Sequence, residues 1–316
     1  MSDGTIRMLP QGSYVTFQSG STQPVLNLAR IRKTLFDDPA IAAKITRDYD
    51  LTTHKPFEEQ IREKLGQEVA KDGDLSDETA FKAATLAIAS SMRQWALVYR
   101  GLGAIKQLLM GYDPQQVATA AQNPAQRGAM VRSLASLLGG QRAHDHAEWI
   151  IRFGESLALT PRIQTTLLAA KAAAGQRAPN LSEAQLNAAV ALLLARGSGP
   201  RSLAHNGIAL RKAVGMGPPI ASEFLRNLGW ASFKPDRHII RLLSAWLPER
   251  DREEITSSVD WSPMFRRRSG DARQFLDFAV LGEKLTPDCE PLNQADQLVW
   301  MMGVYVQRKP RNRRPT

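Results

Sequence analysis

Two glycines between helical segments constrain the fold of this chain more than any other feature. Residues 210–225 carry apolar side chains at helical spacing, interrupted by Gly215-Met216-Gly217 and a pair of prolines. Glycine reaches backbone conformations that a Cβ atom forbids, so this interruption predicts a tight hairpin between two helices. The first amides of the second helix would lack partners within the helix, and such amides bind phosphate.

Helical patterns continue along most of the remaining chain. Residues 25–35 read as a helix, and residues 78–110 read as one long helix or as two helices divided near residues 101–103. Residues 14–17 offer at most one short strand. The sequence therefore predicts an all-α fold.

The charge of the chain favours a polyanionic partner. Its 316 residues include 41 lysines and arginines against 31 acidic residues, which gives a net charge of +10 and a pI near 9.9. This balance suits nucleic acid, and a merely basic soluble protein has the same composition. The apolar content of 43% allows one large domain or two modest ones.

Cysteine content and hydropathy limit the compartment and the cofactors. The single cysteine, Cys289, excludes an internal disulfide and an iron–sulfur cluster held by four thiolates of this chain. The first residues lack a signal-peptide pattern, and no apolar run approaches the roughly 20 residues of a spanning helix. We therefore expect a cytoplasmic protein that makes no membrane contact. Its basic charge adds the expectation of nucleoid association, and we further expect a monomer without a cofactor.

The hairpin region resembles the helix-hairpin-helix motif. Apolar residues lead into the glycine pair, and Ala221, Phe224 and Leu225 follow it at the spacing of that motif. Lys234-Pro235-Asp236-Arg237 then stands at close to the spacing seen in the helix-hairpin-helix (HhH-GPD) DNA glycosylase superfamily. The motif covers about thirty residues, and the helical pattern extends the resemblance loosely over residues 125–306.

This resemblance implies two helical subdomains that flank a cleft and bind double-stranded DNA with a damaged or modified base. The glycosylase-like domain would span residues 125–306, with residues 1–124 left as an unassigned arm and helical region. Residues 307–316 are basic and lack apolar side chains, so we expect a disordered tail. In this family the hairpin grips a phosphate, and an aspartate about one helix downstream serves the flipped nucleotide.

The same resemblance assigns roles to individual residues. Asp236 takes the catalytic role. An aspartate at this place is also expected as the N-cap of the next helix, and the two roles are compatible. The residues expected to bind DNA are Gly215, Gly217, Lys212, Lys234 and Arg237.

One departure from the family pattern bears on the chemistry. Bifunctional members carry a lysine two residues after the second hairpin glycine, where this chain has Pro219. The resemblance therefore implies monofunctional hydrolysis that leaves an abasic site. Two alternatives stay open: a lyase that uses Lys234, and a non-catalytic helix-hairpin-helix protein that binds DNA structures.

The remaining candidates concern a base pocket, a metal and the DNA backbone. A flipped base needs aromatic or apolar walls, for which Trp149 and Trp230 are candidates, although aromatics at helical spacing are more often core. His144 and Glu148 share one helix face, but two ligands do not make a site, so we expect no metal. The arginines at 266–268 could follow the DNA backbone or form a plain basic loop.

Overall fold

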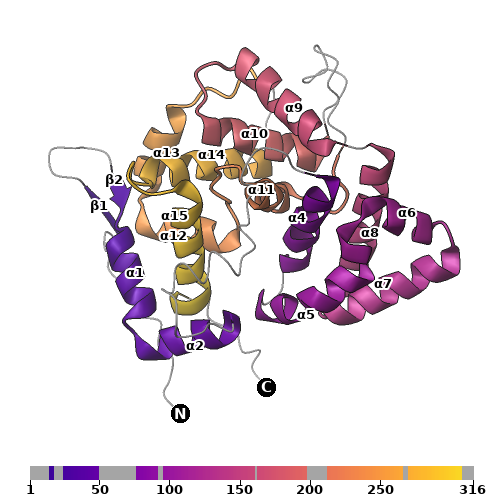
Figure 1. Ribbon diagram of the computed structural model, residues 1–316. Helices are drawn as coiled ribbons and strands as arrows, with labels where there is room; N and C mark the ends of the chain where they lie inside the picture. Colours follow the sequence, from indigo (N-terminus) through magenta and orange to yellow (C-terminus); the bar gives the residue numbers. More distant parts are fainter. Residues whose placement is uncertain are drawn as a thin grey trace, which may run out of the picture.

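The computed structural model describes residues 14–17, 24–49, 76–91, 95–160, 162–197, 212–265 and 270–307. These residues form an all-α fold, as the sequence predicts, with one small ribbon at its edge (Figure 1). In the ribbon, β1 (Val15–Phe17) pairs antiparallel with β2 (Pro24–Leu26). The expectation of one strand followed by a helix from residue 25 is therefore wrong. Residues 24–26 are extended, and the helix starts only after Asn27, whose side chain accepts a hydrogen bond from the amide of Arg30.

The helices follow one another along the whole described chain. The first group is α1 (Leu28–Phe36), α2 (Pro39–Tyr49), α4 (Asp77–Ser90), α5 (Trp95–Leu108), the 3-10 turn η1 (Met110–Tyr112), α6 (Pro114–Ala121), α7 (Pro124–Leu138), α8 (Ala143–Leu159), α9 (Ile163–Arg177) and α10 (Glu183–Arg196). The second group is α11 (Pro218–Asn227), α12 (Arg237–Trp246), α13 (Glu249–Ser257), α14 (Gly270–Leu285), α15 (Leu292–Met301) and the π-helical turn η3 (Met302–Val306).

The apolar stretch at 78–110 forms two helices, and the break lies before the glycines named by the sequence. α4 ends at Ser90, and Ser91 has an extended backbone with ψ 123°. Gly101 and Gly103 lie inside α5. A glycine inside a helix costs only about 1 kcal/mol relative to alanine, so packing readily overrides it.

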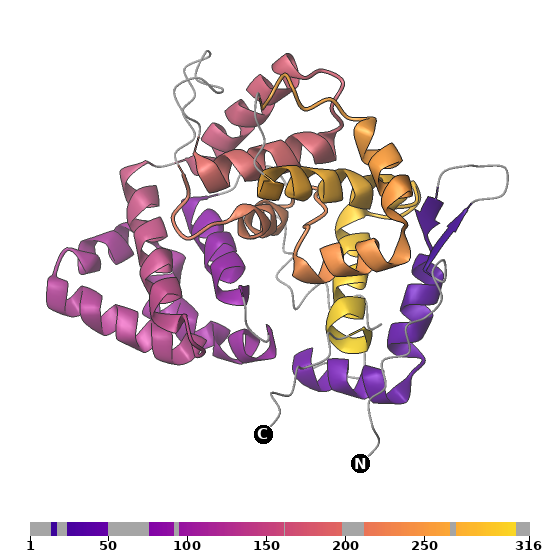
Figure 2. The same ribbon diagram turned by 180° about the vertical axis from the view of Figure 1, so that it is seen from behind.

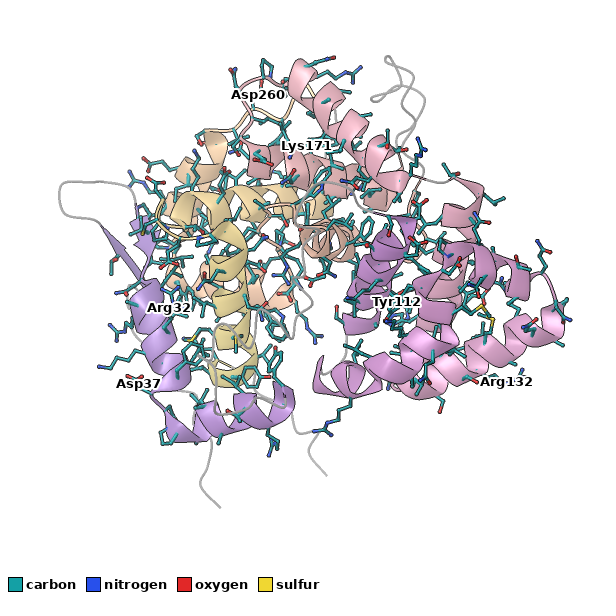
Figure 3. All side chains as sticks on the ribbon, in the orientation of Figure 1. Arg32, Asp37, Tyr112, Arg132, Lys171 and Asp260 are labelled. Carbon is teal, nitrogen blue, oxygen red and sulfur yellow. The ribbon has the colours of Figure 1, made fainter. Side chains whose placement is uncertain are left out.

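Buried side chains form two cores, and the helices that supply them are seen from both sides in Figures 1 and 2. The first core is built by α4 to α11 and most of α14, and the second by the ribbon, α1, α2, α12 and α15. In Figure 3 the buried Tyr112 lies among the helices of the first core, while the exposed Arg132 lies on the outer side of α7. Each core includes residues from before and after residue 124. The expected domain boundary at that residue stays a prediction.

Several expected features lie outside the described residues. These are the helix expected before the hairpin as far as residue 211, the arginines at 266–268 and the tail from residue 308. The described residues 212–214, where the sequence predicts the end of that helix, are not helical. Within the described part of the chain, no helix combines the length and the apolar character needed to cross a membrane.

Candidate active site

The turn before α11 is shaped by Gly215. Its backbone has φ +74°, and a Cβ atom there would lie 2.6 Å from the Cβ of Trp149. Backbone and space therefore both require glycine. Gly217 has an ordinary φ of −81°, and apart from its chain neighbours no described residue comes within 4 Å of where its Cβ would be. The expectation that both glycines serve the turn holds in the structure for Gly215 alone.

The start of α11 has few amide donors. Pro218 and Pro219 occupy its first turn, a position that suits proline and removes two amide hydrogens. The amide of Ala213 donates to the carbonyl of Leu194 at 2.8 Å, which ties the turn to the end of α10. Lys212 is exposed beside this turn.

Asp236 begins α12. Its Oδ1 accepts hydrogen bonds from the amides of His238 at 2.8 Å and Ile239 at 3.0 Å, so the capping role is present. Among the described residues, none donates a hydrogen bond to its Oδ2. One carboxylate oxygen is thus available to a further group.

A cavity of about 470 Å³ lies beside Asp236. Residues of α2, α4, α11, α12 and α15 line it. Tyr49, His238 and Trp300 supply ring systems to this lining, together with Asp236. The volume falls within the roughly 300–1,000 Å³ of small-molecule sites. Asp236 therefore caps a helix and lines a cavity at the same time.

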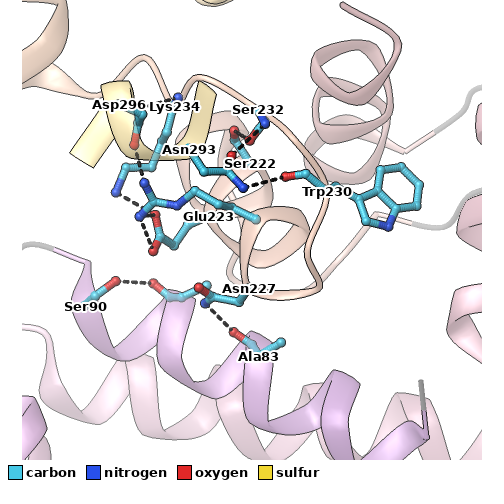
Figure 4. Close-up of polar contacts among 12 residues, drawn as sticks. Ala83, Ser90, Ser222, Glu223, Asn227, Trp230, Ser232, Lys234, Asn293 and Asp296 are labelled. Atoms are coloured by element: carbon cyan, nitrogen blue, oxygen red, sulfur yellow. Dashed lines mark hydrogen bonds and ion pairs between the residues drawn. The ribbon is translucent and has the colours of Figure 1, made fainter. Parts of the chain in front are cut away.

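Four charged side chains form a buried network at this cavity (Figure 4). Arg226 donates to both oxygens of Glu223 at 2.8 and 2.7 Å, and it also donates to Asp296. The ammonium of Lys234 lies 2.8 Å from Glu223. The four side chains are between 0% and 14% exposed, so each charge depends on its neighbours more than on water.

Burial and pairing act on the pKa values of this network in opposite directions. Burial alone would raise the pKa of Glu223. Arg226 and Lys234 have the larger combined effect and lower this pKa to about 2. Burial raises the pKa of Asp296 to about 6, against the attraction of Arg226 and Lys234. Burial lowers the pKa of Lys234, but Glu223, Asp236 and Asp296 together outweigh it and hold that pKa above its usual value. Glu223 and Lys234 are therefore ionised at neutral pH.

The structure gathers some of the predicted site residues and separates others. Lys234, Asp236, Arg237 and Gly217 line the cavity. Gly215 and Lys212 belong to the turn before α11 and do not line it.

The two predicted wall tryptophans lie outside the cavity lining. The ring of Trp149 packs against Gly215, 5.1 Å from the ring of His146, and the Arg142 guanidinium lies 5.0 Å above it. Trp230 is 7% exposed and belongs to the first core, with the Lys171 ammonium 4.8 Å from its ring. Both therefore have packing roles, and neither is among the described residues that line the cavity.

The helix face considered for a metal carries ion pairs instead. Glu148 lies 2.6 Å from Arg127 and 3.0 Å from Arg152. His144 is exposed. The carboxylate of this pair is thus already neutralised by arginines.

Sequence reasoning missed Tyr49, Glu223, Arg226, Asp296 and Trp300. Glu223 and Arg226 had a local signal, since opposite charges three residues apart on a helix face one another. Tyr49 and Asp296 come from distant segments that no short motif connects to the hairpin.

Comparison of the chain with protein-family models, with curated proteins and with solved structures gave no significant match. The functional interpretation therefore depends on the geometry of this site and on the resemblance of residues 210–241.

Proposed function

We propose that the protein is a monofunctional DNA glycosylase that acts at the nucleoid and releases a damaged or modified base from double-stranded DNA. The observation that carries this proposal is the place of Asp236, whose carboxylate lines a cavity of about 470 Å³ beside aromatic side chains. A carboxylate that served only as a helix cap would need no cavity. The resemblance of the hairpin and of Lys234-Pro235-Asp236-Arg237 to the superfamily supports the same assignment.

The proposed reaction needs one ionised carboxylate. As the bond between C1′ and the base breaks, its electron pair leaves with the base, and positive charge develops on the deoxyribose. Asp236 stabilises that charge and orients a water molecule, which adds to C1′. A proton taken up by the base completes the hydrolysis and leaves an abasic site.

The surroundings of Asp236 suit an extruded nucleotide. Trp300 lines the cavity and is half-buried, so its ring can stack with a flipped base, while the fully buried Tyr49 forms part of the apolar wall. Lys212 and Arg237 are exposed, and both carry positive charge that can hold the flanking phosphates.

Replacement of Asp236 by asparagine is the direct test. Asparagine N-caps a helix about as well as aspartate, so Asp236→Asn keeps the cap and removes the charge. A matched control is Asp113→Asn, because Asp113 caps α6 through the amides of Gln115 and Gln116. We expect single-turnover base release to fall about 100-fold or more in Asp236→Asn and to stay parental in Asp113→Asn. Mass spectrometry of bases released from DNA with diverse natural modifications requires no prior choice of lesion.

Two outcomes of this experiment would contradict the proposal. Parental release by Asp236→Asn would leave Asp236 a cap and nothing more. A wild-type protein that binds DNA and releases no base would favour the non-catalytic DNA-structure-binding protein. The capping hydrogen bonds of Asp236 to His238 and Ile239 are the observation that favours that second candidate.

A lyase that uses Lys234 receives less support. Schiff-base formation needs a neutral amine, whereas the Lys234 ammonium is bound to Glu223 and its pKa is raised by that carboxylate. The same reactions run with borohydride should therefore trap no covalent adduct between protein and DNA. An adduct that disappears in Lys234→Gln would establish the lyase instead.

A further inference from the structure

The turn that carries Asp236 is held by hydrogen bonds from both of its sides. The amide of Asp236 donates to the carbonyl of Lys234 at 2.7 Å, which closes a three-residue turn around Pro235. Proline fixes its own φ, so the turn has little freedom. The amide of Lys234 in turn donates to Oδ1 of Asp296 at 2.7 Å. Asp296 thus reaches Asp236 through one residue of rigid backbone.

Two further contacts fix the same loop upstream. The amide of Ser232 donates to Oδ1 of Asn293 at 2.9 Å, so α15 grips the loop at two points (Figure 4). Between those points Phe233 is 2% exposed and packs on α14, where a Cβ on Gly282 would lie 2.1 Å from its ring. The backbone from 232 to 236 is therefore positioned by α14 and α15 together.

Asp296 is an unusual choice for such an anchor, because it is completely buried. A buried carboxylate is costly unless it is paired, and an apolar replacement of a buried ionic network is often neutral or stabilising. Asp296 is paired on one oxygen with Arg226, while its other oxygen holds the Lys234 amide. Glu223 closes the network by binding both Arg226 and Lys234. Apolar side chains could fill the same space at no loss of stability, so an ionic network placed two residues from Asp236 is better explained by positioning.

We propose that Asp296 is a positioning residue that holds the carboxylate of Asp236 at the cavity through the backbone of Lys234. This inference rests on the proposed function, because it assigns Asp296 a role in the rate of base release. Asp296 is not among the described residues that line the cavity, so it acts through another residue and needs no contact with substrate.

The titration of Asp296 provides a readout that mere structural support would not move. Burial raises its pKa to about 6, and the charged groups that act on it are Arg226 and Glu223 from α11 and Lys234 from the loop. Below that pH the carboxyl is neutral and its attraction for Arg226 is lost. Base release should therefore slow as the pH falls from 7 to 5.

The test compares Asp296→Asn with the parent in single-turnover base release and in duplex binding, from pH 5 to pH 8. Asparagine has no charge opposite Arg226, so the ion pair that holds the acceptor of the Lys234 amide in place is lost. At pH 7 we expect the rate to fall about 10- to 100-fold, as a small misplacement of a reacting group does. Duplex affinity should stay within about twofold, because phosphate contacts dominate it. The slowing of the parent between pH 7 and pH 5 should be absent in the variant.

A second variant covers the case in which Asp296→Asn does not fold, as judged by circular dichroism. Asn293→Ala removes the other grip of α15 on the loop, at a half-buried side chain. It should slow release about three- to tenfold and keep the parental pH profile.

The outcomes separate this inference from the function on which it rests. If Asp296→Asn folds and releases base at the parental rate, the positioning role is wrong. If Asp296→Asn does not fold, a parental rate in Asn293→Ala leads to the same conclusion. In either case an inactive Asp236→Asn would still support the glycosylase. A loss of rate matched by an equal loss of duplex affinity also overturns it. A wild-type protein that releases no base overturns both.

Discussion

Gly215 and Gly217 look equivalent in the sequence and differ in the structure. Gly215 combines a φ of +74° with a site where a Cβ would meet Trp149, while Gly217 has neither restriction. We expect Gly215→Ala to lower the free energy of unfolding by about 2 to 4 kcal/mol, from the strained backbone and the overpacked ring. Urea unfolding followed by circular dichroism measures this loss.

Gly217→Ala is the matched control for that prediction. Gly217 N-caps α11, where alanine is a poorer cap than glycine, so its cost should stay below about 1 kcal/mol. Equal losses in the two variants would mean that the turn does not depend on the conformation of Gly215. The two losses therefore show which of the two glycines the fold requires.

At the scale of the elements, α11 carries a carboxylate whose titration should be visible in stability. The folded pKa of Glu223 is about 2 against an ordinary value of 4.5, so its stabilisation is complete above pH 4.5 and is lost as the pH falls through 2. That contribution amounts to about 3 kcal/mol at pH 7 and about 1 kcal/mol at pH 3. The difference in free energy of unfolding between the parent and Glu223→Gln should therefore shrink by about 2 kcal/mol from pH 7 to pH 3.

Urea unfolding of both proteins at the two pH values gives this difference. The raised pKa of Asp296 has the opposite sign, since it favours the folded state as the pH falls toward 4. Glu223 contributes to that raised pKa, so loss of Glu223 also changes the titration of Asp296, and the shrinkage of about 2 kcal/mol is the largest expected. Glu253→Gln, at an exposed residue of α13, is the control and should show no such change. A gap between the parent and Glu223→Gln that is constant with pH would contradict the buried pairing of Glu223.

The elements also mark how far sequence reasoning reaches. Helical periodicity was enough for the all-α class, and the local pattern around Asp236 was enough for its cap, because both depend on neighbours in sequence. The sequence did not predict the break before α5 or the strand β2, because tertiary packing determines the first and cross-strand pairing the second. The role of Asp296 could not be predicted for the same reason, since its contact with Lys234 joins residues 62 positions apart.

For the whole molecule, the net charge of +10 predicts that duplex affinity depends strongly on salt concentration. Each phosphate contact releases counterions, so the logarithm of duplex affinity should fall linearly with the logarithm of salt, by about 0.9 per contact. Lys212 is exposed beside the Gly215 turn, and Lys212→Gln should lower that slope by about 1. Fluorescence anisotropy with a labelled duplex from 50 to 200 mM salt, roughly the range over which such contacts respond, measures both slopes.

The control for Lys212 removes the same charge elsewhere. Lys33 is exposed on α1, which lies at the outer edge of the molecule in both views (Figure 1, Figure 2). If the charge acts only through the total field, Lys33→Gln and Lys212→Gln will weaken binding alike and leave the slope unchanged. If the turn before α11 meets the backbone, only Lys212→Gln will change the slope. A flat salt response of the parent would exclude DNA phosphates as the source of affinity, and with them the glycosylase.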